Sequence, residues 1–269
     1  MSPVLKFTNQ FRLFLKMLSQ NQLKYLRSLA VKKYRHQHHQ FIVEGDKMVS
    51  ELLLQTEISV DFIFALERWA EANARFLRPF SEKLNLVSED ELSRISTLTT
   101  PNQVLAVAGL PSIPCQPELS TTELCFYLDG IQDPGNMGSI LRVADWFGFP
   151  AVFCSPDCAD VYSSKVVQAS MGAILRVQSW EIGLAELLSA APGIPVAGAV
   201  LEGENLFEVA LPQSGLIVIG NEGRGISKST DQLLTHRLSI PKHQAGKAES
   251  LNAAIASGIL AAVFRNRKA

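Results

Sequence analysis

The stretch LCFYLDGIQDPGNMGSILR, residues 124–142, joins three local patterns that together indicate how the chain folds. Leu124–Leu128 is an apolar run typical of a buried strand. A loop rich in Gly, Asn, Asp and Pro follows from Asp129 to Gly138, and a helical pattern then runs through Phe147. A strand, a loop and a helix in this order are typical of an α/β unit with a parallel sheet.

The same alternation continues toward the C-terminus. Further strands are predicted over residues 151–154, 196–200, 216–219 and 238–240, with helical patterns between most of them. A final helix is predicted over residues 250–265, where apolar side chains recur every four residues at Leu251, Ile255, Ile259 and Val263. The C-terminal half therefore predicts an α/β fold built on a mostly parallel sheet.

A second, smaller α/β pattern precedes this half. Helices are predicted over residues 19–35, 47–54, 67–76 and 89–95, and strands over 41–43, 62–65, 84–87 and 104–108. Pro111, Pro114 and Pro117 then indicate a linker. We therefore predict a domain over residues 17–109, a linker over 110–122 and a second domain over 123–269.

The first sixteen residues are set apart from this organisation. Ser19 and Gln22 have the spacing of a helix capping box shortly after Met17. We expect translation to begin at Met17 and residues 1–16 to be an upstream extension. The alternative is an additional helix that packs on the body of the protein.

The composition excludes several classes of protein. The 269 residues are 47% hydrophobic and 19% charged, which suits a globular chain and excludes disorder over most of its length. The uncharged apolar stretch from Ser250 to Phe264 is shorter than the roughly 20 residues that a membrane span requires, so no membrane association is expected. The four cysteines form no CxxC pair, which predicts reduced thiols and a cytoplasmic protein.

Charge is distributed unevenly along the chain. Residues 1–43 contain eight Lys and Arg side chains and no acid, whereas the remainder carries 17 basic and 26 acidic side chains. A basic segment ahead of an acidic body indicates an anionic polymer as partner, with Lys32, Lys33 and Arg35 as candidate contacts to it. The alternative is a solvated basic helix that has no partner.

Three polar loops follow predicted strands of the C-terminal half. They are residues 129–142, the glycine-rich GNEGRGI at 220–226, and IPKHQAGKAESLN at 240–252. Because the carboxyl ends of parallel strands meet at one edge of a sheet, these loops are expected to converge on a ligand. Arg142 is predicted about one turn into its helix, from where it can point back toward that ligand. The alternative is that each loop is an ordinary turn or helix cap.

Other chemistries lack their motifs. The loops match neither the Walker sequence GxxxxGK[ST] nor GxGxxG, so a phosphate-binding loop and a nicotinamide-dependent dehydrogenase are disfavoured. Cys154 and Cys158 lie across a predicted strand end, and His36, His38 and His39 have no nearby cysteine. No metal site is therefore predicted.

Taken in order, the three loops resemble the motifs of the SpoU/TrmH family of RNA ribose methyltransferases. A fourth, shorter match lies between the first and second loops. The matching residues are Asn136, Gly138, Arg142 and Ala144, then Ser170, Gly172 and Ala173, then Gly220, Asn221, Glu222, Gly225 and Ile226, and finally Ile240, Pro241, Ser250, Leu251 and Asn252. The stretch between Pro241 and Ser250 is about two residues longer than is common in the family.

The N-terminal domain also resembles a known module. Residues 17–108, with a basic helix followed by FIVEG at 41–45, are similar to the small RNA-binding α/β domain often fused ahead of this catalytic domain. That module resembles a ribosomal protein. The resemblance thus implies an RNA-binding domain followed by a catalytic domain whose parallel sheet is tied into a deep trefoil knot, with S-adenosylmethionine as cofactor and a homodimer formed through the knot.

The resemblance also implies an activity, the methylation of a ribose 2′-hydroxyl, with ribosomal RNA favoured over transfer RNA. The alternatives are a transfer RNA 2′-O-methyltransferase and a non-catalytic RNA-binding member of the same fold. By resemblance the catalytic residues are Arg142, Asn136, Glu222, Ser250 and Asn252. The cofactor-binding residues are Leu201, Gly220, Asn221, Gly223, Ile240 and Leu251. Because free arginine is a poor base, Arg142 is expected to orient the hydroxyl and a phosphate.

Overall fold

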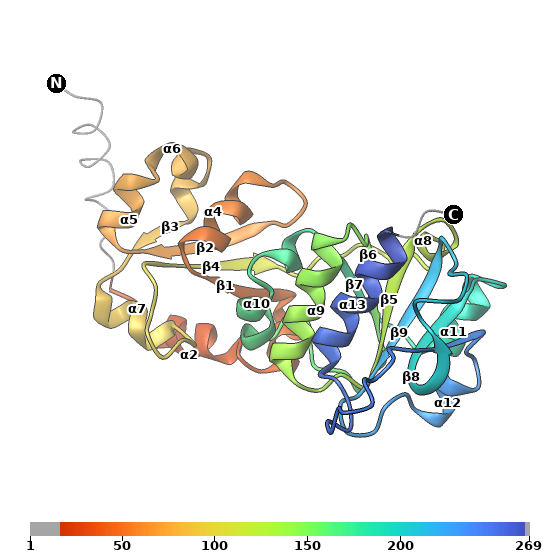
Figure 1. Cartoon of the computed structure of the whole chain (residues 1–269). Coiled ribbons are helices and arrows are strands. Elements are labelled where there is room, and N and C mark those ends of the chain that lie inside the picture. The colour runs from red at the N-terminus through yellow and green to blue at the C-terminus, as the bar shows by residue number, and fades with distance from the viewer. Residues whose placement is uncertain (1–16, 267–269) are drawn as a thin grey trace. The chain divides into compact units, whose positions relative to one another are not determined.

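The computed structural model describes residues 17–266, so the predicted extension over residues 1–16 lies outside the described residues. The chain divides into two compact units (Figure 1). Unit 1 is Met1–Ser112 with Tyr162–Gln168, and unit 2 is Ile113–Val161 with Ala169–Ala269. Within residues 17–266, no helix has both the length and the apolar character needed to cross a membrane.

Unit 1 is built on a four-stranded sheet in the order β1-β4-β2-β3. Strand β4 is antiparallel to β1 and β2, and β3 is parallel to β2. The strands are β1 (Gln40–Glu44), β2 (Val60–Ala65), β3 (Leu84–Leu86) and β4 (Val104–Gly109). The helices are α2 (Gln20–Ser28), α3 (Lys32–His38), α4 (Asp46–Leu54), α5 (Glu67–Ala72), α6 (Ala74–Leu77), the 3-10 turn η2 (Arg78–Lys83) and α7 (Glu89–Ile95).

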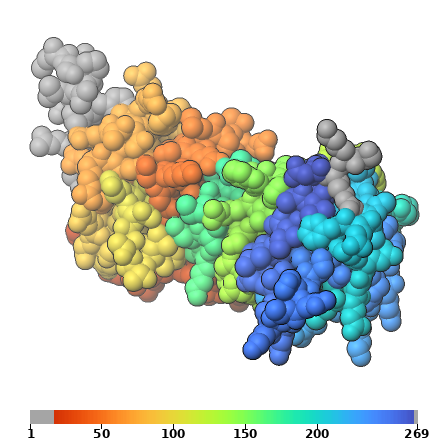
Figure 2. All heavy atoms as spheres, in the orientation of Figure 1, coloured from red at the N-terminus to blue at the C-terminus, as the bar shows by residue number. Residues whose placement is uncertain are grey.

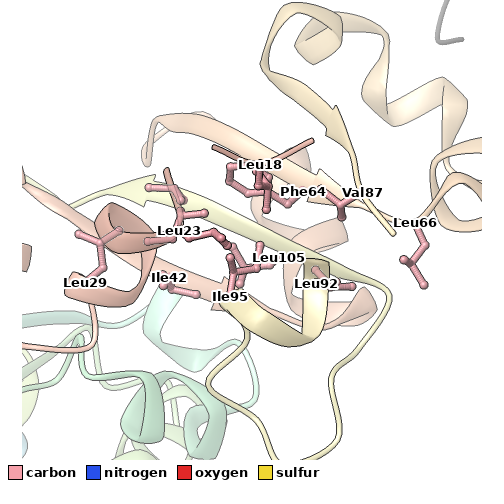
Figure 3. Packing of buried hydrophobic residues seen from close by; sticks show 12 residues of the cluster. Leu18, Leu23, Leu29, Ile42, Phe64, Leu66, Val87, Leu92, Ile95 and Leu105 are labelled. Atoms are coloured by element: carbon pink, nitrogen blue, oxygen red, sulfur yellow. The ribbon is translucent and has the colours of Figure 1, made fainter. Parts of the chain in front are cut away.

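The core of unit 1 lies between this sheet and helices α2 and α7 (Figure 3). Leu23 of α2 and Ile95 of α7 are buried with Phe64 and Leu105 of the strands. Both helices begin with a reciprocal capping box, at Ser19 with Gln22 and at Ser88 with Glu91, and the first of these confirms the predicted box.

Two predicted helices of unit 1 are interrupted. The helix expected over residues 19–35 ends at Ser28 and restarts at Lys32, because Val31 is extended and serves as the N-cap of α3. The helix expected over residues 67–76 is divided at Asn73 into α5 and α6. Neither break contains Gly or Pro, so no local breaker signalled it.

Unit 2 contains a six-stranded sheet in the order β10-β8-β9-β5-β6-β7. Every pair of neighbouring strands is parallel, as the alternation of strands and helices predicts. The strands are β5 (Leu124–Asp129), β6 (Ala151–Cys154), β7 (Gln178–Glu181), β8 (Val196–Asn205), β9 (Gly215–Gly220) and β10 (His236–Ser239). The helices are α8 (Leu119–Thr122), α9 (Pro134–Trp146), α10 (Ser164–Ser170), η3 (Ala173–Leu175), α11 (Leu184–Ala190), α12 (Lys228–Asp231) and α13 (Ala253–Asn266). Most of α10 groups with unit 1.

Helices cover both faces of this sheet. Side chains alternate along β5, so Cys125 and Tyr127 join a core with Leu187 of α11. Phe126 points to the other face, where its ring lies 4.8 Å from that of Phe149. Helices α9 and α13 pack against one another in this unit. Because all neighbouring strands are parallel, the carboxyl ends of β5, β9 and β10 lie along the same edge of the sheet.

The last helix differs from its prediction in extent and in its buried face. It begins at Ala253, three residues after the predicted start. The buried side chains are Ala253, Ser257, Leu260, Ala261 and Phe264. The stripe that contains Ile255, Ile259 and Val263 is instead exposed or half-buried. The apolar side chains do recur every four residues, but they form a stripe on the surface of the single chain and not its buried face.

Candidate active site

The first loop positions a polar side chain at the start of α9. Asp133 is the N-cap of this helix, and its carboxylate accepts a hydrogen bond from the Asn136 backbone N–H at 2.8 Å. A methyl group on Gly138 would lie 2.4 Å from the Ala169 side chain and 2.8 Å from the Ser170 backbone. Glycine is therefore required where α9 approaches residues 169–170.

Asn136 joins all three loops. Its side-chain N–H donates to Glu222 Oε1 in the second loop. Its side-chain oxygen accepts a hydrogen bond of 2.8 Å from Asn252 Nδ2, at the end of the third loop. Asn252 also caps α13, because its Oδ1 accepts from the backbone N–H groups of Ala254 and Ile255. The structure thus brings three of the predicted catalytic side chains into one hydrogen-bonded line, Asn252–Asn136–Glu222.

Arg142 and Ser250 stand outside this line. Both are exposed, and neither side chain makes a hydrogen bond or an ion pair with another residue in the range 17–266. Since α9 begins at Pro134, Arg142 lies about two turns into the helix, not the one turn that the sequence predicted. Side chains on a helix tilt toward its N-terminus, so the guanidinium extends back toward the Asn136 end of α9.

The second loop is held in shape by Asn221. Its side-chain N–H donates to the Gly130 carbonyl at 2.8 Å, and its Oδ1 accepts from the backbone N–H groups of Gly223 and Arg224. Gly225 has φ +68°, a conformation that favours glycine. Asn221 therefore acts through the geometry of the loop, tying its tip to the loop after β5.

A further polar group, which no sequence motif indicated, supports these loops. The Gly130 N–H donates to Ser155 Oγ at 2.9 Å, and the Ser155 hydroxyl donates to Asp157 at 2.6 Å. Asp157 Oδ2 lies 3.7 Å from the guanidinium of Arg224. The only signal in the sequence was the position of these residues directly after β6, at the carboxyl edge of a parallel sheet.

The two cysteines beside this group are not arranged as metal ligands. Cys158 has its pKa lowered to about 7, chiefly by a hydrogen bond with Cys154, while burial opposes the shift. Both thiols are free. Across residues 17–266, no three His, Cys, Asp or Glu side chains are grouped so that they could hold a metal ion.

The third loop and the strand ends have open backbone groups. Residues 241–250 are exposed throughout, and this segment lies in the blue surface region of unit 2 in Figure 2. Within the described chain, the amide and carbonyl groups of Ile240 and of Leu251 have no hydrogen-bond partner. Leu201, in the middle of β8, is 77% exposed, and Leu251 is exposed as well. Open amides beside exposed aliphatic side chains suit a flat heterocycle such as adenine, which is both apolar on its faces and polar at its edges.

In unit 1, the three predicted RNA contacts divide into two kinds. Lys32 and Lys33 are exposed at the start of α3. Arg35 is only 3% exposed, and its guanidinium donates to the Leu29 carbonyl at 2.8 Å. The prediction that Arg35 contacts RNA is therefore corrected, because its guanidinium is used inside the domain to hold the turn between α2 and α3.

Both parts of the chain match families of known proteins. Residues 123–262 match the SpoU rRNA Methylase family, and residues 20–106 match the MRM3-like substrate binding domain. The 23S rRNA (guanosine(2553)-2′-O)-methyltransferase of Bacillus subtilis is 28% identical over 242 residues, which cover 89% of this chain and 94% of that protein.

Two solved structures extend this similarity to the fold. One, from Porphyromonas gingivalis and assigned to RNA methyltransferases of the TrmH family, has a TM-score of 0.83 and 42% identity, and covers 94% of this chain and 100% of that one. An rRNA methyltransferase from Sinorhizobium meliloti with bound AdoMet has a TM-score of 0.80 and 25% identity, and covers 92% and 95%.

The fold and the site, with these matches, define an RNA methyltransferase. S-adenosylmethionine is the cofactor of this class, as the bound relative illustrates. The chain belongs to the SpoU rRNA methylase family, which confirms the resemblance seen in its three loops.

Proposed function

We propose that this protein transfers the methyl group of S-adenosylmethionine to a ribose 2′-hydroxyl in ribosomal RNA. The observation that carries the proposal is the hydrogen-bonded line Asn252–Asn136–Glu222, which gathers one residue from each family motif at the carboxyl edge of the sheet. The names of the Bacillus relative and of the AdoMet-bound structure support the substrate and the cofactor.

The residues around this line can hold the cofactor. S-adenosylmethionine supplies a methyl group on a positively charged sulfur. The open backbone groups of Ile240 and Leu251 would bind its polar edges, and the side chain of Leu201 would cover an apolar face. Gly220 and Gly223 would form the wall of the site because they project no side chain, and Asn221 would hold that wall in shape through its hydrogen bonds.

The substrate side of the reaction is assigned to Arg142. Its guanidinium donates hydrogen bonds in a planar fork. It would hold the ribose hydroxyl and a neighbouring phosphate together, so that the phosphate takes the proton as the oxygen attacks. Asn136, Glu222 and Asn252 would fix the loops around it, and Ser250, exposed two residues before Asn252, would contact the RNA.

Transfer of label tests this function. The purified protein, given S-adenosylmethionine labelled in its methyl group, is expected to modify ribosomal RNA and to yield 2′-O-methylated nucleosides on digestion. Excess chelator is expected to leave the rate unchanged, because residues 17–266 offer no group of three or more His, Cys, Asp or Glu side chains that could hold a metal ion. If label enters transfer RNA and not ribosomal RNA, the substrate is transfer RNA. If label enters neither RNA, the protein is better described as a non-catalytic RNA-binding protein.

We assign residues 17–109 to RNA binding, 110–122 to the linker and 123–269 to catalysis. The two family matches, over residues 20–106 and 123–262, support this division. Helix α8 lies within the predicted linker, so that segment is not irregular throughout. A cytoplasmic location accompanies the assignment, supported by four cysteines that are all free thiols.

The basic segment is assigned to RNA phosphates. Changing Lys32 and Lys33 together to Ala is expected to weaken RNA binding and to make the slope of log affinity against log salt shallower, by about 0.7 for each lost contact with single-stranded RNA. Cofactor affinity should stay near that of the wild type. Lys47→Ala, at an exposed lysine of α4, is the matched control and should keep the wild-type slope. An unchanged slope in the double variant would contradict this assignment.

We also propose the trefoil knot that the family resemblance implies. Its support is the return of the chain after β10, where α13 packs against α9 and β9. Asn252 then bonds to Asn136, which lies 116 residues earlier in the sequence. The strand order, in which β10 is separated from β5 by β8 and β9, supports the same path.

The proposed assembly is a homodimer formed through α9 and α13. Trp146 at the end of α9 is 84% exposed, and Ile255 on α13 is 57% exposed. The half-buried Ile259 and Val263 continue the α13 stripe. Apolar side chains on two helices that pack together are typical of a protein–protein interface.

A further inference from the structure

Unit 1 carries an exposed group of aromatic rings that its basic charge does not explain. The group, here the aromatic patch, consists of Tyr25 on α2, His38 on α3 and Phe62 on β2. The Tyr25 ring centroid lies 5.2 Å from that of His38 and 6.5 Å from that of Phe62, both nearly perpendicular. His38 is exposed, and Phe62 is 40% exposed. Rings of this size at a surface are costly to hydrate, so their exposure indicates a ligand.

Phe62 lies on β2 directly after a bulge in the sheet. The register between β2 and β4 shifts between Val60 and Phe62, which marks a bulge at Asp61. Two residues further along the same strand, Phe64 is buried in the core, with its ring centroid 6.3 Å from that of Phe62. Because β2 pairs with β4 in regular register from Phe62 to Ala65, Phe62 and Phe64 share one face of the strand, and Phe64 anchors the exposed ring of Phe62 on the core.

Hydrogen bonds fix the central ring. The Tyr25 hydroxyl donates to Gln40 Oε1, and Gln40 Nε2 donates to Asp61 Oδ2 at 2.6 Å. Burial and then the charge of Asp61 raise the pKa of Tyr25, so its ring stays neutral. The polar end of Tyr25 is therefore satisfied inside the domain, which leaves its ring as a rigid support for the two exposed rings.

Positive charge lies on the same helices. His38 is in the last turn of α3, whose first residues are the exposed Lys32 and Lys33. Lys24 precedes Tyr25 on α2 and is exposed too. Lys33 Nζ lies 6.0 Å from the ring centroid of Tyr34, itself 39% exposed. Rings beside cations are the combination that binds single-stranded nucleic acid, because the rings stack on bases while the cations meet phosphates.

We propose that the aromatic patch stacks unpaired bases of the RNA substrate, so that unit 1 selects single-stranded or looped RNA over duplex RNA. This rests on the proposed function in one respect, that the ligand is RNA. Beyond that function, the proposal specifies that the bound RNA is unpaired and that the side chains of the aromatic patch distinguish it from duplex RNA. A duplex has its bases stacked on one another and offers the patch only its backbone.

The test compares two RNA probes, a short unstructured oligonucleotide and a blunt duplex of equal length. Binding to the full-length protein is followed by fluorescence anisotropy over a range of salt. Phe62→Ala is expected to weaken binding of the single strand by about 5- to 150-fold, the range found for loss of one stacked base. Binding of the duplex should be unchanged, and the salt slope should stay at the wild-type value because no phosphate contact is lost.

Two further variants make the outcome specific. Phe62→Trp keeps a flat ring and should bind the single strand as the wild type does. Phe76→Ala removes a partly exposed ring on α6, outside the patch, and should have no effect. Thermal melting of each variant checks that unit 1 remains folded.

Each remaining result has a defined meaning. The proposal is overturned if Phe62→Ala binds the single strand normally, if it loses both probes equally, or if the wild type binds neither probe. A protein ligand for the patch would give the first of these results. The readout is binding and needs no methyl transfer, so a wild type that binds RNA but transfers no label would refute the proposed activity and leave this inference standing.

Discussion

Arg142→Lys is expected to lower the rate of methyl transfer by roughly 10²–10⁴-fold, the scale found for a positioned electrostatic or acid–base group. Lysine keeps the charge but has a single ammonium, so it cannot hold a hydroxyl and a phosphate in one planar fork. Arg142→Ala should lose as much. Single-turnover methylation at saturating RNA and cofactor measures this step directly.

Both variants should keep the fold and the affinity for S-adenosylmethionine. Arg142 is exposed, and its side chain makes no hydrogen bond or ion pair with another residue of the described chain. The carboxylates that could have paired with it have other partners, since Asp145 accepts two hydrogen bonds from Arg176 and Glu222 accepts one from Asn136. Removing Arg142 therefore leaves no buried group unsatisfied.

Arg176→Ala provides a matched control on the same surface. It breaks the ion pair with Asp145, which is partly exposed and so contributes little to stability, and it should leave the methylation rate near the wild-type value. A full rate in Arg142→Ala would refute the substrate role. So would a parallel loss of rate and melting temperature, because that is the signature of a structural ion pair.

Much of this architecture could be predicted from local patterns, and the failures have physical causes. Strands β5, β6 and β9 are apolar runs bounded by turn residues, and each was predicted within a residue or two of its ends. Strand β7, with the sequence QSWE, was missed because it lies at the edge of the sheet and its residues are exposed or half-buried. It is ordered by pairing with β6, a long-range contact that a local pattern does not contain.

The site shows the same division. Motif order identified Asn136, Glu222 and Asn252, and the sheet brings them into contact. Ser155 and Asp157 were missed because their role depends on which loops become neighbours, which is decided by strand order. Arg35 was misassigned because charge in a sequence does not reveal whether a guanidinium finds a carbonyl inside its own domain.

Gly220→Ala is expected to have the second large effect, on the cofactor side of the site. A methyl group on Gly220 would lie 2.4 Å from the carbonyl carbon of Gly225 and 2.5 Å from the backbone nitrogen of Ile226. Both are backbone atoms, so the loop itself must move. Overpacking of this kind costs about 1–3 kcal/mol of stability. A displacement of about 1 Å at a site that orients reactants can lower the rate roughly 10²-fold.

Gly223, three residues further along the same loop, provides a control. It tests whether any added side chain in this loop is harmful or only one at Gly220. At Gly223 the nearest atom to an added methyl group would be Asn221 Oδ1, at 3.7 Å, which is an ordinary contact. Gly223→Ala should therefore keep the wild-type melting temperature. Calorimetric titration with S-adenosylmethionine should show weakened binding in Gly220→Ala, in step with its lost activity. Unaltered cofactor affinity in a destabilised Gly220→Ala would place the cofactor away from this loop, since a wall of the site cannot shift without disturbing the ligand that it contacts.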